Sequence, residues 1–181
     1  MRNWRHRGWN AGKLSGIKPS VHLPPIILDW FAARGWQPRR HQLEMLDAAG
    51  DGRHALLVAA TGAGKTLAGF LPSLSDLIAD PSDGLHTLYI SPLKALAVDV
   101  RRNLLKPIEE MDLDIRVETR TGDTPSDRKA RQRAKPPHIL LTTPESLSLL
   151  LSYPDSFQMF AGLKRIVIDE IHAFATTKRG D

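Results

Sequence analysis

Short apolar runs alternate with longer amphipathic stretches through most of the chain. The short runs suit strands buried on both faces, and the longer stretches repeat their apolar positions with the period of a helix. Regular alternation of strand and helix predicts a mostly parallel sheet covered by helices on both faces. We expect strands at residues 55–59, 87–91, 115–119, 139–142 and 165–169, and helices at about 23–34, 40–49, 66–79, 94–111, 125–134 and 145–151.

The turn after the first expected strand is rich in glycine and is followed by a lysine and a threonine. Glycines at such a turn let the backbone curl until its N–H groups face phosphate oxygens, and the next helix adds the positive end of its dipole. Lys65 would reach the β and γ phosphates, and Thr66 would offer its hydroxyl to Mg²⁺. We expect a nucleoside triphosphate to bind to Thr61, Gly62, Ala63, Gly64, Lys65 and Thr66.

Two carboxylates follow the last expected strand, at the carboxyl edge of the sheet where open α/β sheets bind ligands. Asp169 would hold Mg²⁺ through water, and Glu170 would orient and deprotonate the attacking water. Taken separately, a glycine-rich turn is typical of ordinary tight turns, and an acidic pair is typical of solvated surface. Their occurrence together, in this order, favours hydrolysis of a nucleoside triphosphate.

Composition excludes several other classes of protein. The chain has 181 residues, of which 41% are apolar, so it is long enough for one α/β domain with a core. It has no cysteine, which excludes disulfides and thiolate metal sites. No apolar stretch approaches the roughly 20 residues that span a membrane, and no hydrophobic segment of a secretory signal follows the basic start. We therefore expect a cytoplasmic location without membrane association.

The net charge of +5 comes from the first 20 residues, because the rest of the chain carries equal numbers of basic and acidic residues. We expect residues 1–20 to form a basic, flexible tail ahead of a domain at residues 21–181. The tail would contact nucleic-acid phosphates or stack on bases. Alternatively, it is an unstructured leader, or upstream sequence read from the wrong start codon. Its basic residues are Arg2, Arg5, Arg7, Lys13 and Lys18.

The phosphate loop has Ala59 where the strict pattern has glycine, and in this form it resembles the loop of superfamily 2 helicases. The segment from Gly35 to Gln42 resembles the adenine-reading Q motif of these enzymes. By that resemblance Gln42 reads the base, since its amide can both donate to adenine and accept from it, and Trp36 or Phe31 packs beside the base. His172, after the acidic pair, resembles the histidine that couples the nucleotide to a second motor domain in DExH-box enzymes.

Three segments at the ends of later expected strands resemble helicase motifs Ia, Ib and Ic. Free N–H groups at a helix start, with a hydroxyl or a lysine, can hold single-strand phosphates without reading sequence. Each segment alone would also be an ordinary helix start or turn. The basic run at residues 128–135 either borders the nucleic acid or is a solvated helix. The candidate nucleic-acid residues are Ser91, Pro92, Lys94, Gly122, Thr143, Pro144 and Glu145.

The motif residues together resemble the Lhr-type (large helicase-related) DExH-box helicases, including their DNA-ligase-associated members, over residues 23–181. The resemblance implies a three-layer, RecA-like P-loop NTPase domain that uses ATP and Mg²⁺ to translocate along single-stranded DNA, usually 3′ to 5′, in DNA repair. DNA is favoured over RNA as the partner, and the ligase is a further candidate partner. An RNA helicase, a non-motor module that binds nucleotide or nucleic acid, and an AAA+ type ATPase are the alternatives.

The resemblance also implies a second RecA-like domain that closes over ATP and supplies an arginine finger. The motifs of that domain do not occur in these 181 residues, so we expect the first RecA-like domain to be C-terminally truncated. We therefore expect the chain alone to bind nucleotide weakly, to hydrolyse it hardly at all and to aggregate readily.

Overall fold

The computed structural model describes residues 23–60 and 62–175. The predicted basic tail, residues 1–20, lies outside the described residues, and so does Thr61 of the predicted phosphate loop. The described part begins with two helices, followed by alternating helices and strands. The elements are α1 (Pro25–Ala33), α2 (Arg40–Gly50), α3 (Lys65–Ala79), β1 (Thr87–Ile90), α4 (Lys94–Glu110), β2 (Val117–Arg120), α5 (Ser126–Ala134), β3 (Ile139–Thr142), α6 (Pro144–Leu151), α7 (Ser156–Phe160), β4 (Arg165–Ile168) and α8 (Ile171–Ala175).

The four strands form one sheet in the order β2-β3-β1-β4, with every pair parallel. Thr87 of β1 lies opposite Ile139 of β3 on one side and Arg165 of β4 on the other. Parallel pairing places the carboxyl ends of all four strands at one edge of the sheet. The loops that follow these strands therefore start close to one another, as the sequence analysis expects of a ligand site.

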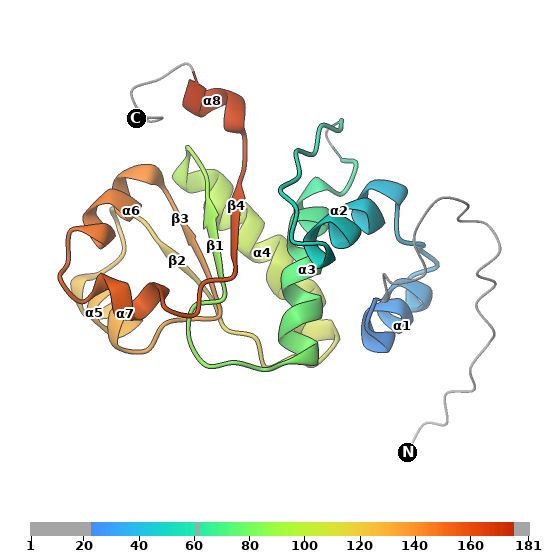
Figure 1. Ribbon diagram of the computed structural model, residues 1–181, viewed down its shortest axis with the longest axis horizontal. Coiled ribbons are helices and arrows are strands. Elements are labelled where there is room, and N and C mark those ends of the chain that lie inside the picture. The colour runs from blue at the N-terminus through green and yellow to red at the C-terminus, as the bar shows by residue number, and fades with distance from the viewer. Residues whose placement is uncertain (1–22, 61, 176–181) are drawn as a thin grey trace.

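Alternate residues of the strands enter two separate cores, one on each face of the sheet. Tyr89 and Leu141 pack with apolar residues of α1 to α4, whereas Leu88 and Leu140 pack with Leu150 of α6 and its neighbours. Figure 1 shows α3 and α4 on one side of the sheet and α5, α6 and α7 on the other. Burial on both faces explains why the central strands β1 and β3 are mostly apolar. The predicted three-layer α/β fold is confirmed.

The predicted strand at residues 55–59 is wrong for the described structure. This segment pairs with no described strand, and the side chains of Leu56 and Val58 are 74% and 86% exposed. The outer edge of β4 carries no paired strand in the described part either, and Ile166 and Ile168 of β4 are half-exposed. An apolar run shows only that a segment can be buried; a strand also needs a hydrogen-bonded neighbour, which residues 55–59 lack.

The other predicted elements are confirmed with small shifts at their ends, as expected of helix and strand boundaries. The pattern of apolar positions did not predict α7 and α8, because these helices have five residues each and are too short to show a helical period. None of the helices in the described ranges combines the length and the apolar character that crossing a membrane requires.

Candidate nucleotide and nucleic-acid site

The glycine-rich loop at the start of α3 has the backbone that a phosphate loop needs. Gly62 and Gly64 have φ angles of +78° and +76°, in the left-handed region that favours glycine. Gly64 is the N-cap of α3, so the first N–H groups of a 15-residue helix face this loop. The Lys65 ammonium donates to the carbonyl oxygens of Ala59 and Ala60, at 2.8 and 3.2 Å, across the base of the loop.

A close approach between α3 and β4 joins the two nucleotide motifs. A Cβ built on Gly69, one turn after Lys65, would lie 3.4 Å from Cγ1 of Val167 in β4. Val167 is two residues before Asp169, so the first turn of the phosphate-loop helix lies against the strand that carries the carboxylates. The structure thus packs the helix that follows the glycine-rich loop against the strand that precedes the carboxylates, two segments about 100 residues apart in the sequence.

Asp169 is held by two donors at the end of β4. Its Oδ1 atom accepts a hydrogen bond from the Glu170 N–H at 2.9 Å, and its Oδ2 atom accepts one from the Tyr89 hydroxyl at 2.6 Å. Glu170 has φ of +51°, an uncommon angle for a residue with a side chain, and strained backbone of this kind clusters at functional sites. Nδ1 of His172 is 3.4 Å from a Glu170 carboxylate oxygen, and the His172 side chain is 78% exposed.

Gln42 lies against the phosphate loop from the side of α2. Its Oε1 atom accepts from the Arg39 N–H at 2.9 Å, and its Nε2 atom donates to the Gly64 carbonyl at 3.4 Å. The Arg39 guanidinium donates to the Gly62 carbonyl at 3.2 Å. The predicted Q motif therefore touches the loop, but the Gln42 amide already has backbone partners on both of its atoms.

The two aromatic residues predicted beside adenine differ in their accessibility. Phe31 is 3% exposed and belongs to the core with α3 and α4, so it is not available to a nucleotide. Trp36 is 56% exposed, and its ring meets the Trp30 ring edge-on at 5.9 Å. Only Trp36 remains a candidate for that contact.

The loops after β1, β2 and β3 form a groove of about 340 Å³ at the carboxyl edge of the sheet. The groove brings together five of the seven predicted nucleic-acid residues; Ser91 is fully buried beside it, and Pro144 is half-buried at the start of α6. Thr143 caps α6, where its hydroxyl accepts from the Ser146 N–H. The groove residues are Pro92, Leu93, Lys94, Gly122, Thr143, Glu145, Ser146 and Leu149.

An acidic residue from the segment that resembles motif Ib, which was not among the candidate nucleic-acid residues, binds the lysine of this groove. The Lys94 ammonium lies 2.8 Å from both carboxylate oxygens of Asp123, across the loop after β2. A Cβ on Gly122 would lie 3.5 Å from the same ammonium. The exposed side chains of Leu93 and Leu149 add apolar surface to the groove. Leucines on helix surfaces carry no sequence signal of such a role.

The basic run at residues 128–135 is largely bound within the protein. Arg128 and Arg131 form ion pairs with Glu118 of β2 at 3.4 and 3.1 Å. The Arg133 guanidinium lies 4.0 Å from the centre of the Tyr153 ring, and the Lys129 ammonium donates to the Gly122 carbonyl. These contacts support the alternative in which α5 is a solvated, structural helix.

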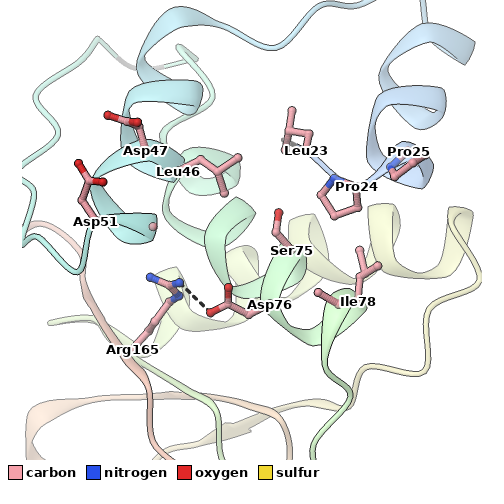
Figure 2. A pocket seen from close by; sticks show the side chains of 12 residues that line it. Leu23, Pro24, Pro25, Leu46, Asp47, Asp51, Ser75, Asp76, Ile78 and Arg165 are labelled. Atoms are coloured by element: carbon pink, nitrogen blue, oxygen red, sulfur yellow. Dashed lines mark hydrogen bonds and ion pairs between the residues drawn. The ribbon is translucent and has the colours of Figure 1, made fainter. Parts of the chain in front are cut away.

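A larger cavity, about 590 Å³ in volume, lies away from all of these motifs. It is bounded by α1, the end of α2, the second half of α3 and the start of β4 (Figure 2). Its charged groups are already paired: Asp76 binds Arg165 at 2.7 Å, and Asp47 and Asp51 bind Arg53. None of the predicted site residues lines it, so its size does not indicate the functional site.

Comparisons with known proteins agree with the fold and the motifs. Residues 39–181 match the DEAD/DEAH box helicase family. The chain is 39% identical to the Lhr helicase/probable uracil glycosylase of Mycolicibacterium smegmatis, over 92% of this chain and 12% of that protein. It is 42% identical to the ATP-dependent helicase Lhr-Core of Methanocaldococcus jannaschii, over 87% of this chain and 20% of that protein. The chain thus spans a fifth or less of the length of these relatives.

Solved structures of helicases share the fold. The Mycobacterium smegmatis helicase Lhr, bound to ssDNA and AMP-PNP, is 40% identical with a TM-score of 0.77, covering 87% of this chain and 21% of that chain. The DUF1998 helicase MrfA, bound to DNA and AMPPNP, is 32% identical with a TM-score of 0.77, covering 87% and 22%. The chain therefore belongs to the DEAD/DEAH box helicase family, as a helicase domain homologous to that of the Lhr-type helicases.

Proposed function

We propose that this chain is the ATP-binding and strand-binding part of an ATP-dependent DNA helicase. The observation that supports the proposal is the close approach of Gly69 in α3 to Val167 in β4, which joins the helix after the glycine-rich loop to the strand before Asp169. The groove formed by three strand-end loops opens at the same edge of the sheet. One relative, 40% identical to this chain, was solved with AMP-PNP and single-stranded DNA, which supports both ligands.

The phosphates would bind where the loop and the start of α3 present N–H groups. Lys65 would exchange its two carbonyl partners for the β and γ phosphates, because a phosphate is the stronger partner for an ammonium group. Glu170 would orient the attacking water and accept its proton. His172, exposed beside Glu170, would transmit the state of the nucleotide to the second motor domain.

The residues present fit Mg²⁺ as the metal ion. The Thr66 hydroxyl and the Asp169 carboxylate are hard oxygen donors of the kind that Mg²⁺ prefers. Within residues 23–60 and 62–175, no group of three or more His, Cys, Asp or Glu side chains could hold a metal alone. Phosphate oxygens and water would therefore complete the coordination. When bound, the ion neutralises charge on the transferred phosphoryl group.

The single strand would bind in the groove through its sugar and phosphates. Lys94 and Thr143, with the N–H groups at the starts of α4 and α6, would contact a backbone without reading bases, whereas the buried Ser91 would only support the loop after β1. DNA is proposed over RNA because the relatives were solved with DNA. Translocation, a second RecA-like domain with an arginine finger, and a role in DNA repair with a ligase among the partners are proposals for the longer protein.

Nucleotide binding tests the first half of the proposal. By calorimetry, the chain should bind ADP more tightly than GDP if Gln42 exchanges its backbone partners for adenine. Lys65→Ala should weaken both nucleotides, because it removes the charge facing the β phosphate. Equal binding of ADP and GDP would show that Gln42 does not recognise adenine. Its role would then be to support the loop through the Gly64 carbonyl.

Strand binding tests the second half. Affinity for single-stranded DNA should depend little on sequence and fall steeply with salt, because phosphate contacts release counterions. Deleting residues 1–20 should remove only part of the salt dependence. A salt dependence that disappears with the tail would contradict binding in the groove. Strand displacement on tailed DNA and RNA by a longer protein would then test direction and substrate.

A further inference from the structure

The hydroxyl of Tyr89 connects parts of the site that the sequence motifs define separately. Tyr89 lies in β1 and is 2% exposed, and its hydroxyl donates to Oδ2 of Asp169, in the neighbouring strand's loop, at 2.6 Å. Its ring packs against Phe70 of the phosphate-loop helix, with ring centroids 5.6 Å apart. Tyr89 therefore touches both the helix that would hold the phosphates and the carboxylate that would hold the metal.

The two hydrogen bonds to Asp169 fix the rotation of its carboxylate. One donor is the backbone of Glu170 and the other is the side chain of Tyr89, and each binds a different oxygen. An ionised carboxylate has about four acceptor positions, so both oxygens keep capacity for a metal ion or its bound water. A carboxylate held only by the Glu170 N–H would be free to turn at its second oxygen.

The Tyr89 hydroxyl is directed at Asp169 from a buried position in β1. A phenylalanine would fill the same apolar space, so packing alone does not account for a hydroxyl directed at Asp169.

We propose that Tyr89 is a positioning residue that orients the Asp169 carboxylate toward the magnesium ion of the bound nucleotide. This inference rests on the proposed function. Groups that hydrogen-bond to a metal ligand without touching the metal commonly change metal affinity by roughly 10- to 100-fold when they are removed. Tyr89 would raise the affinity of the nucleotide complex for the metal ion and would leave the affinity for nucleotide without metal unchanged.

The test compares Tyr89→Phe with Tyr153→Phe, which makes the same change at the chain's only other tyrosine. Electron paramagnetic resonance of Mn²⁺ would measure the affinity of the ADP-bound chain for the metal, and calorimetry in EDTA would measure ADP alone. Tyr89→Phe should weaken Mn²⁺ binding by roughly tenfold or more with unchanged ADP affinity in EDTA. Tyr153→Phe should change neither.

Two outcomes would overturn the inference. One is Mn²⁺ affinity within twofold of the wild type. The other is an equal loss of Mn²⁺ and metal-free ADP affinity, which would indicate a role in folding only. If the wild-type chain itself binds no ADP with or without metal, the proposed function fails and the inference falls with it.

A second measurement leaves the hydroxyl in place, in case Tyr89→Phe does not fold. Incorporating 3-fluorotyrosine gives fluorine signals from two tyrosines, which Tyr153→Phe would assign. Adding Mg²⁺ to the ADP complex should shift the Tyr89 signal and leave the Tyr153 signal in place. A Tyr89 signal that does not respond to metal in the ADP complex would overturn the inference.

Discussion

At the scale of single residues, the phosphate loop depends on a glycine that meets two separate demands. Gly64 has φ of +76°, and a Cβ there would lie 2.9 Å from Nε2 of Gln42. Gly52 has a similar φ of +66° but open space around it. Comparing the two glycines separates the cost of the backbone angle from the cost of displacing Gln42.

We predict that Gly64→Ala and Gly52→Ala both lower the free energy of unfolding, by about 1–2 kcal/mol, because alanine is strained at these angles. Only Gly64→Ala should also weaken ADP binding, since it pushes the Gln42 amide away from the loop. Thermal unfolding and calorimetry would measure the two effects. Unchanged ADP affinity in Gly64→Ala would show that the contact between Gln42 and the loop does not support the nucleotide.

At the scale of the elements, the loop after β2 competes with the nucleic acid for the positive charge of Lys94, which follows β1. Asp123 neutralises Lys94 inside the groove where phosphates would bind. Both side chains are more than half exposed, so the pair itself adds little stability. Its effect should therefore appear in binding.

We predict that Asp123→Asn tightens binding of single-stranded DNA, because Lys94 can then bind a phosphate without first breaking an ion pair with Asp123. The slope of log affinity against log salt should steepen by about 0.7 if one more phosphate is neutralised. Asp83→Asn makes the same charge change before β1, where Asp83 pairs with Arg116, and should leave the slope unchanged. A titration of labelled DNA at several salt concentrations measures both; weaker binding by Asp123→Asn would mean that Asp123 positions Lys94 instead.

At the amino ends of the strands, away from the candidate site, buried polar groups connect β1 to α3 and β4. The His86 ring hydrogen-bonds with the Thr87 hydroxyl at 2.8 Å, and that hydroxyl donates to Ser73 of α3. The other ring nitrogen of His86 is 3.4 Å from Asp76, which also binds Arg165. This chain of contacts fastens α3 beneath the sheet at the end away from the nucleotide motifs.

We predict that the protein loses stability as the pH falls below about 6.5. Burial lowers the pKa of His86 and of His138 from 6.5, so the unfolded state binds more protons between that value and the folded pKa. Their contribution is complete above 6.5 and is lost as the pH falls through the lowered pKa. Asp76 raises the His86 pKa in part, and Lys164 and Arg165 lower it. In thermal unfolding between pH 5 and 7.5, the stability of His86→Gln should change less with pH than that of the wild type. An unchanged pH dependence would show that His86 does not contribute to the loss of stability at low pH.

At the scale of the whole molecule, the described part holds the residues of the proposed nucleotide site except Thr61 and leaves apolar side chains exposed along the outer strand β4. Ile166 and Ile168 of β4, and Leu56 and Val58 before the phosphate loop, are all exposed. Exposed apolar strands with an unpaired edge favour association between chains. The relatives that share this domain are about five to eight times as long as the matched region.

We predict that the 181-residue chain binds ATP but hydrolyses it very slowly, with or without DNA. An arginine finger from a second domain contributes roughly 10³- to 10⁵-fold in comparable NTPases, because it stabilises charge on the transferred phosphoryl group. A phosphate-release assay measures turnover, with Glu170→Gln as the background. Rapid turnover that DNA stimulates and Glu170→Gln abolishes would contradict this prediction.

The sequence by itself predicted the candidate residues of the site and determined the order of most of the helices and strands. Glycines before Lys65 and carboxylates after an apolar run are local patterns, and the physical reasons for them do not depend on distant contacts. The apolar runs of β1 and β3 likewise predicted buried strands, because burial on both faces requires continuous apolar sequence. The same pattern predicted β4, but its Ile166 and Ile168 are half-exposed. The roles given to these site residues remain predictions.

The tertiary structure decided what pairs with what. Residues 55–59 have an apolar pattern like that of β3, yet they form no strand, because a strand requires a hydrogen-bonded neighbour. The bond from Tyr89 to Asp169, the pairing of Lys94 with Asp123 and the binding of Arg128 and Arg131 to Glu118 each join residues on different elements. Such contacts depend on the strand order β2-β3-β1-β4 and on the register between strands. Local residue patterns do not specify either, because both arise only when distant segments of the chain pack together.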